Sequence, residues 1–301
     1  MKRFLVLPVL LVVALATTTA LAIVIPQPGT NPFDKDSPVA RFPDLDQNRD
    51  YTGDGAAEVT WCAPTAAANS VWYFGNAGYP ELIPNAGGNV ANADALITSL
   101  GGLMGTADPN GTTIANCVAG LQGYFNANTT TPFVVSWANA WTFLDGAGAP
   151  SAQNLWNFMT NELLNCEDVL PIIWLPGAGG HNGPPTDDSE VVLTQLDSVS
   201  GHLVTMTAYN IAPYPGTITI IDPDDAAVGT GHFFPAVPAA SKITWNLTLV
   251  GNSPQGTALA INGGAGGWIV GAIVASPVPE PSLLLLLAPG LGVLALRFRK
   301  K

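Results

Sequence analysis

The stretch WCAPTAAANSVWYFG, residues 61–75, decides how the chain is expected to fold. Pro64 suits the first turn of a helix and the alanines after it are strong helix formers, so we predict a helix over 64–74 that ends at Gly75. Cys62 then stands at the helix start, where unpaired backbone amides and the helix dipole favour a thiolate over a thiol. Cys62 is therefore a candidate nucleophile, with half of a disulfide or an inert buried thiol as the alternatives.

Apolar periodicity divides the chain into a helical first part and a strand-rich second part. Helical spacing predicts further helices at 92–104, 112–126 and 152–164. Short apolar, partly β-branched runs predict strands at 133–137, 169–175, 191–196, 202–209, 217–221, 243–250 and 268–274. Helices followed by strands indicate an α+β domain with an antiparallel sheet.

Three histidines are available as a partner for Cys62. His181 lies in a glycine- and proline-rich loop, and His232 lies in GTGHFFP, in a strand or a turn. His202 opens the predicted strand 202–209, and rigid elements hold catalytic geometry better than loops do. His202 is therefore the expected base, and a hydrogen-bonded structural histidine is the alternative.

Hairpin geometry adds Asp222 to this pair. The predicted strand 202–209 runs into the turn IAPYPG, and TITIID returns the chain to Asp222. The start of one strand of an antiparallel hairpin lies near the end of the next, so His202 and Asp222 are expected at the same end of the sheet. Asp222 is then placed to orient the imidazole and stabilise its charged form. The alternative is that Asp222-Pro223 only begins a turn.

Three short motifs in this order resemble those of the papain-fold cysteine peptidases, especially the bacteriocin-processing branch. They are CAPTA at 62–66, GHLVT at 201–205 and IDP at 221–223, within a resemblance that spans roughly residues 45–225. The resemblance implies an α+β, papain-like cysteine peptidase fold, in which a helical first half with the nucleophile-bearing helix packs on an antiparallel β-sheet second half. It also implies hydrolysis of peptide or amide bonds.

The same resemblance assigns a role to each residue of the site. Cys62 attacks a carbonyl, His202 moves the proton, and Asp222 holds the histidine in the useful tautomer. The oxyanion hole uses the Cys62 backbone amide and an upstream glutamine, and the nearest is Gln47, fifteen residues before the cysteine and further away than the family pattern has it. Two alternatives stay open, namely transglutaminase-like acyl transfer, and a catalytically inactive papain-like domain that serves surface adhesion or the matrix.

The charge of the chain restricts its partners. Between residues 23 and 276, four basic residues stand against 21 acidic ones. This balance disfavours nucleic acid and anionic lipid, and it makes strongly acidic peptides poor substrates. A protein or peptide substrate without strong negative charge is expected.

An alternation of polar residues near the start of the domain is typical of a calcium loop. It consists of Asp44, Asp46, Asn48 and Asp50. Arg49 stands where such a loop needs glycine, and Gly55 stands where it needs glutamate. We therefore expect a solvated acidic loop, and neither a metal nor a cofactor.

The first 22 residues are predicted to be a secretory signal peptide. Met1-Lys2-Arg3 is basic, residues 4–16 are uncharged and almost wholly apolar, and Ala20-Leu21-Ala22 is a small-residue cleavage pattern. Residues 23–44 are then expected to be a linker, and residues 45–276 the α+β domain.

The last 24 residues, 278–301, carry a three-part pattern. VPEP at 278–281 is followed by an uncharged segment at 282–296 and by a basic end, which favours a membrane segment with a cytoplasmic terminus. This pattern resembles the PEP-CTERM sorting signal of Gram-negative bacteria. The resemblance implies processing by an exosortase-type membrane enzyme, anchoring by the tail as a transmembrane helix beforehand, and delivery to the cell surface or extracellular matrix.

The chain has three cysteines, and an exported protein folds in a compartment that permits disulfides. An odd count leaves at least one thiol free in a monomer. The simplest arrangement pairs Cys117 with Cys166 and leaves Cys62 reduced. Three buried, unpaired thiols are the alternative.

Overall fold

The structure is a computed structural model that describes eleven stretches of the chain. They are residues 33–36, 41–139, 151–165, 167–175, 192–193, 201–210, 215–224, 231–234, 242–253, 256–264 and 267–278. The expected signal peptide, the sorting signal from residue 279 onward, His181 and Cys166 lie outside the described residues.

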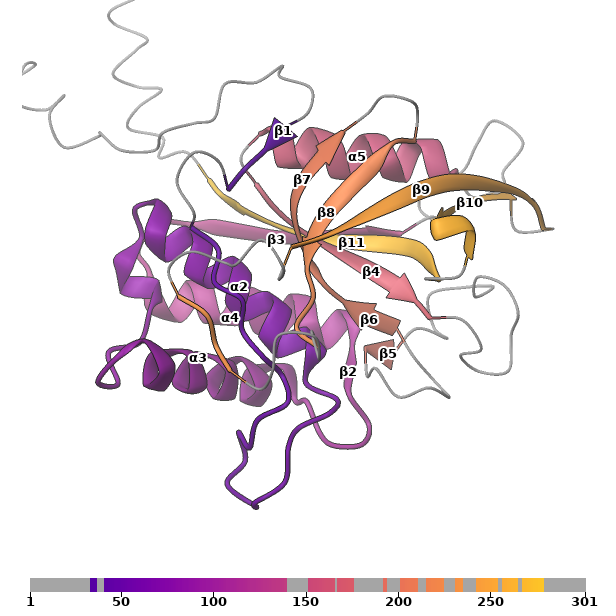
Figure 1. Cartoon of the computed structure of the whole chain (residues 1–301). Coiled ribbons are helices and arrows are strands. Elements are labelled where there is room, and N and C mark those ends of the chain that lie inside the picture. Colours follow the sequence, from indigo (N-terminus) through magenta and orange to yellow (C-terminus); the bar gives the residue numbers. More distant parts are fainter. Residues whose placement is uncertain are drawn as a thin grey trace, which may run out of the picture.

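Three helices from the first part of the chain pack together on one side of the molecule (Figure 1). They are α2 (Cys62–Ala77), α3 (Asn89–Met104) and α4 (Ile114–Asn128), with the short 3₁₀ turn η1 (Pro80–Leu82) between α2 and α3. A fourth helix, α5 (Ala152–Leu164), packs separately against β4, β10 and β11. The four helices predicted from the sequence are confirmed.

Helix α2 is longer than predicted at both ends. It begins at Cys62 and continues through Gly75 to Ala77. A Cβ at position 75 would lie 2.5 Å from the Ile83 side chain, so Gly75 permits close packing and does not end the helix. Gly78 caps it instead, with φ at 129°, a conformation that favours glycine, and its N–H donates to the Phe74 carbonyl.

Other elements surround most of α2. All its residues from Cys62 to Gly75 are buried, and the alanines at 66–68 allow neighbouring elements to approach closely. The ring of Trp61, which precedes the helix, lies against Gly101 of α3, where an added Cβ would overlap it. The start of α2 is therefore held on several sides.

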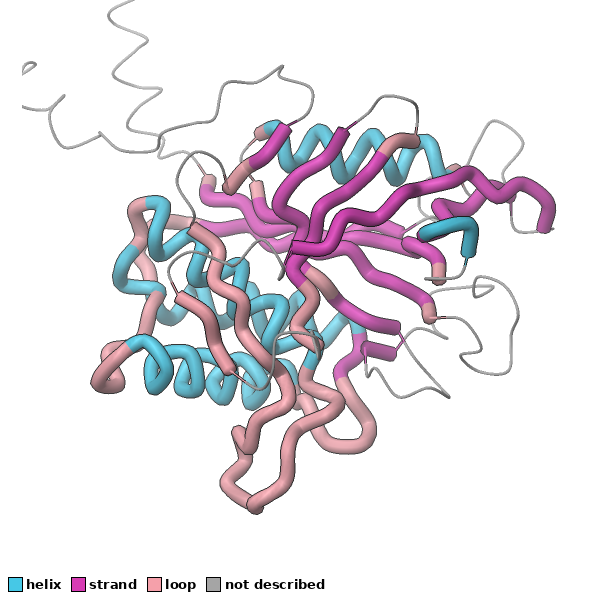
Figure 2. Tube along the Cα trace, in the orientation of Figure 1, coloured by secondary structure: helices cyan, strands magenta, loops and turns pink. Residues whose placement is uncertain are grey.

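The strands of the described residues, which differ in length, form one sheet (Figure 2). They are β1 (Phe33–Asp34), β2 (Thr112–Thr113), β3 (Phe133–Asn139), β4 (Asp168–Trp174), β5 (Val192–Leu193), β6 (Gly201–Leu203), β7 (Thr205–Asn210), β8 (Thr217–Ile221), β9 (Lys242–Ser253), β10 (Gly256–Ile261) and β11 (Trp268–Pro277). A second 3₁₀ turn, η5 (Asn262–Gly264), follows β10. The strands predicted at 133–137, 169–175, 217–221, 243–250 and 268–274 are confirmed, and the strand predicted at 202–209 is divided between β6 and β7.

Six of these strands close on themselves into an antiparallel barrel. Neighbours pair in the order β7, β8, β9, β10, β11 and β4, and β4 then pairs with β7 through Val169 and Met206. The predicted papain-like α+β fold, with a helical half packed on a sheet half, is therefore wrong. The described residues instead form a closed barrel together with four helices.

The sequence could not reveal this closure, for two physical reasons. Alternating apolar residues line one face of an open sheet and the interior of a barrel in the same way. Closure also needs β10, which lies between β9 and β11 in the ring and was not predicted. Its pairing with both neighbours completes the ring.

The two faces of the barrel wall belong to two apolar cores. Inward residues of all six strands form one core with α5, including Val169 and Ile173 of β4. Alternate residues of β4, such as Leu170 and Ile172, instead belong to a core shared with α2, α3 and α4. Helix α2 therefore lies on the outer face of the barrel, against β4, β6 and β7.

Residues 33–36, ahead of the expected domain start at 45, are built into this fold. β1 pairs with β7, and Lys35 Nζ donates to Asp168 Oδ1 at 3.0 Å, with both side chains fully buried. Lys35 Nζ also lies 3.8 Å from the centre of the Tyr73 ring. A buried ion pair thus joins the N-terminal segment, the barrel and α2.

Within the described residues, none of the helices has the length and apolar character needed to cross a membrane. The membrane segment expected at 282–296 lies outside those residues.

Candidate active site

His202 and Asp222 meet at one end of the sheet. His202 lies in β6, and Asp222 directly follows β8. Because β7 and β8 are antiparallel with Thr205 opposite Ile221, residues just before Thr205 and just after Ile221 come to the same end. His202 Nε2 lies 2.7 Å from Asp222 Oδ1, a hydrogen-bond distance.

Helix α2 brings Cys62 to the same end of the sheet. The Thr205 hydroxyl donates to the Ala66 carbonyl at 3.2 Å, which fixes the first turns of α2 on β7. Cys62 is the first residue of α2, and its N-cap residue, Trp61, gives no side-chain hydrogen bond to the helix amides. The positive end of the helix dipole therefore acts beside the thiol without a capping side chain.

Helix α2, which begins at Cys62, packs against β6, which carries His202. Cys62 is also one of the groups that raise the pKa of His202, which is consistent with a thiol beside the ring. His202 Nδ1, the nitrogen not used by Asp222, is buried and has no hydrogen-bond partner of good geometry. The thiol therefore approaches the ring without completing a hydrogen bond. Such loose geometry is usual in catalytic sites without substrate.

Burial and charge act in opposite directions on this pair. Burial lowers the pKa of His202, but the charge of Asp222, the hydrogen bond to it and the contact with Cys62 together raise that pKa well above its ordinary value. Burial likewise raises the pKa of Asp222, whereas the charge and hydrogen bond of His202 and the Asp224 N–H lower it overall. The two shifts agree, and they describe an imidazolium paired with a carboxylate at neutral pH.

Gln47, the predicted oxyanion donor, is hydrogen-bonded both to the turn after Asp222 and to the segment before Cys62. Its backbone N–H donates to the Pro223 carbonyl at 2.9 Å, directly after Asp222. Its side-chain Nε2 donates to the Val59 carbonyl at 3.1 Å, three residues before Cys62. The side chain is buried, so the distance along the sequence does not keep Gln47 away from the site.

Cys62 and His202 are closed off from solvent. Cys62 has an exposed fraction of 0% and His202 of 3%, whereas the Asp222 side chain is 19% exposed. Chemistry on an external substrate therefore requires this end of the sheet to open.

His232, the other described histidine, belongs to a separate network. Its Nδ1 accepts from the Asp46 backbone N–H at 3.1 Å, and its Nε2 bonds Asp94 at 3.0 Å. Asp94 also accepts two hydrogen bonds from Arg49, each at 3.0 Å. Burial lowers the pKa of His232, and the hydrogen bond to Asp94 offsets only part of this effect. His232 thus fixes the loop at 44–50.

The predicted disulfide between Cys117 and Cys166 is not formed, because Cys117 is a free, buried thiol, as is Cys62. Cys117 lies on the buried face of α4. Burial raises its pKa, and the nearby charge of Cys62 adds to this effect, so Cys117 stays a protonated, unreactive thiol. The physical reason is packing, since α4 turns Cys117 into the core shared with α2.

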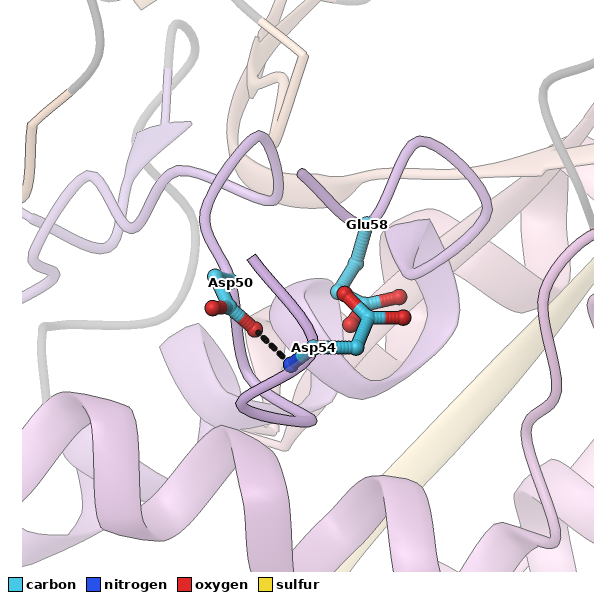
Figure 3. A group of neighbouring side chains, drawn as sticks. All are labelled: Asp50, Asp54 and Glu58. Carbon is cyan, nitrogen blue, oxygen red and sulfur yellow. Dashed lines mark hydrogen bonds between the residues drawn. The ribbon is translucent and has the colours of Figure 1, made fainter. Parts of the chain in front are cut away.

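Three carboxylates in the acidic loop lie close enough together to be considered as metal ligands. Asp50, Asp54 and Glu58 have ligand oxygens within 4.8 Å of one another (Figure 3). Each already accepts loop hydrogen bonds, with donors at Thr52, Gly53, Asp54, Gly55 and Ala56. These bonds account for the positions of the three carboxylates, so we assign them to the loop structure.

Two residues near the site, Asn48 and Asp224, were not predicted to belong to it. Asn48 Nδ2 donates to Asp224 Oδ1 at 2.6 Å, and the Asp224 backbone N–H donates to Asp222 Oδ1 at 3.0 Å. The run Asp222-Pro223-Asp224 was the available signal, because such a turn presents a second carboxylate beside the first.

Comparison with protein-family models, with curated proteins and with solved structures finds no match to this chain. The function is therefore argued from the geometry of the site.

Proposed function

We propose that this protein is a cysteine hydrolase that cleaves peptide or amide bonds with Cys62, His202 and Asp222. One observation supports this most directly: the His202 ring is bonded to Asp222 through Nε2 and also has the Cys62 thiol as a polar neighbour. His232, which fixes the loop at 44–50, instead has both nitrogens hydrogen-bonded. The proposal rests on this arrangement and not on the overall fold.

The chemistry follows from the charges of the three side chains. The proposed attacking group is a Cys62 thiolate formed beside the His202 imidazolium, and its sulfur attacks the carbonyl carbon of the substrate. The carbonyl oxygen takes the negative charge, and the Cys62 backbone N–H and Gln47 Nε2 are the proposed donors to it. His202 then gives its proton to the leaving amine as the C–N bond breaks, and a thioester remains on Cys62.

Water completes the cycle. His202, now neutral, takes a proton from a water molecule whose oxygen attacks the thioester carbon. The C–S bond breaks, the carboxylic acid leaves, and the thiolate and imidazolium are restored. Asp222 stays ionised throughout and holds the ring through Nε2.

A second candidate is an inactive domain that serves surface adhesion or the matrix. The complete burial of Cys62 favours it, because a substrate cannot reach the sulfur in this conformation. The two candidates differ in whether the site opens while the protein remains folded.

Thiol labelling of the intact, folded protein separates the two candidates. We expect iodoacetamide or an epoxide probe to modify Cys62 and to leave Cys117, a buried thiol in the helical core, unmodified. Cys62→Ser should abolish the label that peptide mapping finds at position 62, together with amide hydrolysis, with little change in Tm, and Cys117→Ser is the matched control that keeps both. Labelling of Cys62 and Cys117 only in denaturant would reject the hydrolase and support the inactive domain.

We also propose that the chain is exported and sorted to the cell surface or extracellular matrix. The signal-like residues 1–22 and the VPEP, apolar and basic segments of 278–301 support this proposal. The exosortase-type enzyme is its proposed processing partner, and the tail is its proposed membrane anchor before processing. β11 ends at Pro277, so processing near residue 279 would leave every strand of the barrel intact.

Deleting residues 279–301 tests the sorting proposal. The truncated protein should be released in soluble form and keep the Tm of the full chain, because the deletion removes no barrel strand. A truncated chain that stays attached to the membrane, or one that does not fold, would contradict the proposal.

A further inference from the structure

The turn that carries Asp222 is tied to the acidic loop at two points. The Gln47 backbone N–H donates to the Pro223 carbonyl at 2.9 Å. The Asn48 side-chain amide donates to the Asp224 carboxylate at 2.6 Å. Loop and turn are 176 residues apart at the second contact, so it is tertiary and cannot arise from local chain geometry.

Each member of this contact is itself held in place. The Asn48 backbone N–H donates to Asp46 Oδ1 at 2.8 Å, so the amide is presented by an ordered loop. At the other side, the Asp224 backbone N–H donates at 3.0 Å to Oδ1 of Asp222, the same oxygen that bonds His202. The orientation of Asp224 therefore affects the Asp222 carboxylate directly.

The contact between Asn48 and Asp224 also offsets the repulsion between the Asp222 and Asp224 carboxylates. Burial raises the pKa of Asp224, and the charge of Asp222 raises it further, whereas the hydrogen bond from Asn48 lowers it. The amide of Asn48 thus stabilises a second carboxylate beside Asp222, where a neutral hydrogen-bond donor is the suitable partner.

We propose that Asn48 is a positioning residue of the candidate site, which through Asp224 holds the turn that keeps Asp222 on Nε2 of His202. This inference rests on the proposed function and extends it to a residue that does not touch the reacting atoms. Loss of the amide loosens the 222–224 turn, weakens the bond between Asp222 and His202, and makes the imidazolium less stable.

The test is an NMR titration of the histidine rings in the full chain, which contains only three histidines. We expect Asn48→Ala to lower the pKa of His202 by roughly 0.5–1 unit, the effect of weakening one charge-assisted hydrogen bond. The pKa of His232 should stay unchanged. Asn76→Ala is the matched control, because it also removes one amide donor, to the Arg41 carbonyl at 2.7 Å, but at the opposite end of α2 from Cys62.

Asp224→Ala removes the same contact from the turn side and serves if Asn48→Ala does not fold. It should lower the pKa of His202 at least as much, since it also removes a negative charge, and the double variant should add nothing further. An unchanged His202 pKa in folded Asn48→Ala or Asp224→Ala, even with reduced stability, would overturn the inference. That result is distinct from failure of the hydrolase proposal, which is judged by labelling of Cys62 in the unaltered chain.

Discussion

His202 and His232 are the same side chain in two surroundings, and the difference separates a reactive residue from a structural one. Both rings are buried and bonded to an aspartate, at 2.7 Å for His202 and at 3.0 Å for His232. Burial lowers the pKa of each. The pKa of His202 nevertheless ends well above its ordinary value, and that of His232 ends below it.

The second nitrogen and the neighbouring charges explain the opposite outcomes. Nδ1 of His232 accepts a backbone N–H from Asp46, a bond that protonation would break, and its aspartate is shared with Arg49. Nδ1 of His202 has no such donor, and a thiol lies beside the ring. Nδ1 of His202 is therefore available for proton exchange, whereas Nδ1 of His232 is occupied by the backbone.

The largest expected difference between the two regions is in thiol reactivity. His202→Ala should reduce the rate at which iodoacetamide modifies Cys62 at pH 6 by roughly 100-fold, because a thiol without a cationic partner is protonated there. His232→Ala should leave that rate close to its original value. Labelling quenched at set times and followed by peptide mass mapping measures both rates. An equal loss of Cys62 labelling in the two variants would contradict the distinction between the surroundings of His202 and His232.

Stability should not separate the two histidines in the way that thiol reactivity does. His232→Ala removes hydrogen bonds to Asp46 and Asp94 and leaves a cavity, which should cost about 2–3 kcal/mol of the free energy of unfolding. His202→Ala should cost a similar amount, because it leaves the Asp222 carboxylate without its charged partner, although Nδ1 has no hydrogen bond to lose. Urea denaturation at pH 7 measures the two costs, and a negligible cost at His202 would show that its ion pair with Asp222 contributes little to stability.

An aromatic stack joins the residue before α2 to His232, and substitutions at two glycines of α3 test how much this stack contributes to stability. Tyr51 stacks on Trp61 with ring centres 5.5 Å apart and on His232 at 6.5 Å. Gly101→Ala would push into the Trp61 ring and should cost about 1–3 kcal/mol. Gly102→Ala has open space and should be neutral or stabilising by up to about 1 kcal/mol. Thermal unfolding compares the stability of the two variants, and equal effects would show that the Trp61 ring moves aside at little energetic cost.

The smallest expected effect is the pH dependence of stability. A lowered folded pKa means that the contribution of His232 is present above its unfolded value of about 6.5 and is lost as the pH falls below it. A raised folded pKa means that the contribution of His202 is present below about 6.5 and is lost as the pH rises through the folded value. His232→Gln should flatten the acid side of the stability curve and His202→Gln the alkaline side, as urea midpoints from pH 5 to 9 would show.

Local patterns were enough to predict the elements that carry the candidate site. Proline and alanine spacing predicted the helix that begins at Cys62, although Gly75 proved to be a packing residue. The His202–Asp222 contact corresponds to the geometry expected of an antiparallel hairpin, in which the two strands are close along the chain. These features depend on residues near one another in sequence, where propensity and turn geometry act.

Contacts between distant segments set the limits of that prediction. The papain-like fold was wrong because β4 closes on β7 and because β10 completes the ring. The predicted disulfide was wrong because α4 directs Cys117 into the core. Asn48 was noted only as part of the polar alternation at 44–50 and was not predicted to support the site, since nothing near it in the sequence indicates a partner 176 residues away.

The sequence by itself determined where a cysteine, a histidine and an aspartate stand on their own helix and strands, because hydrogen bonding and side-chain periodicity within each element are local. The tertiary structure decided that the sheet closes, that Cys62 and His202 are buried, and that the loop at 44–50 supports the turn at 222–224. Those outcomes depend on pairing and desolvation between segments brought together only by the packed cores. The contrasting pKa shifts of His202 and His232 have the same origin, since each follows from neighbours that the fold supplies.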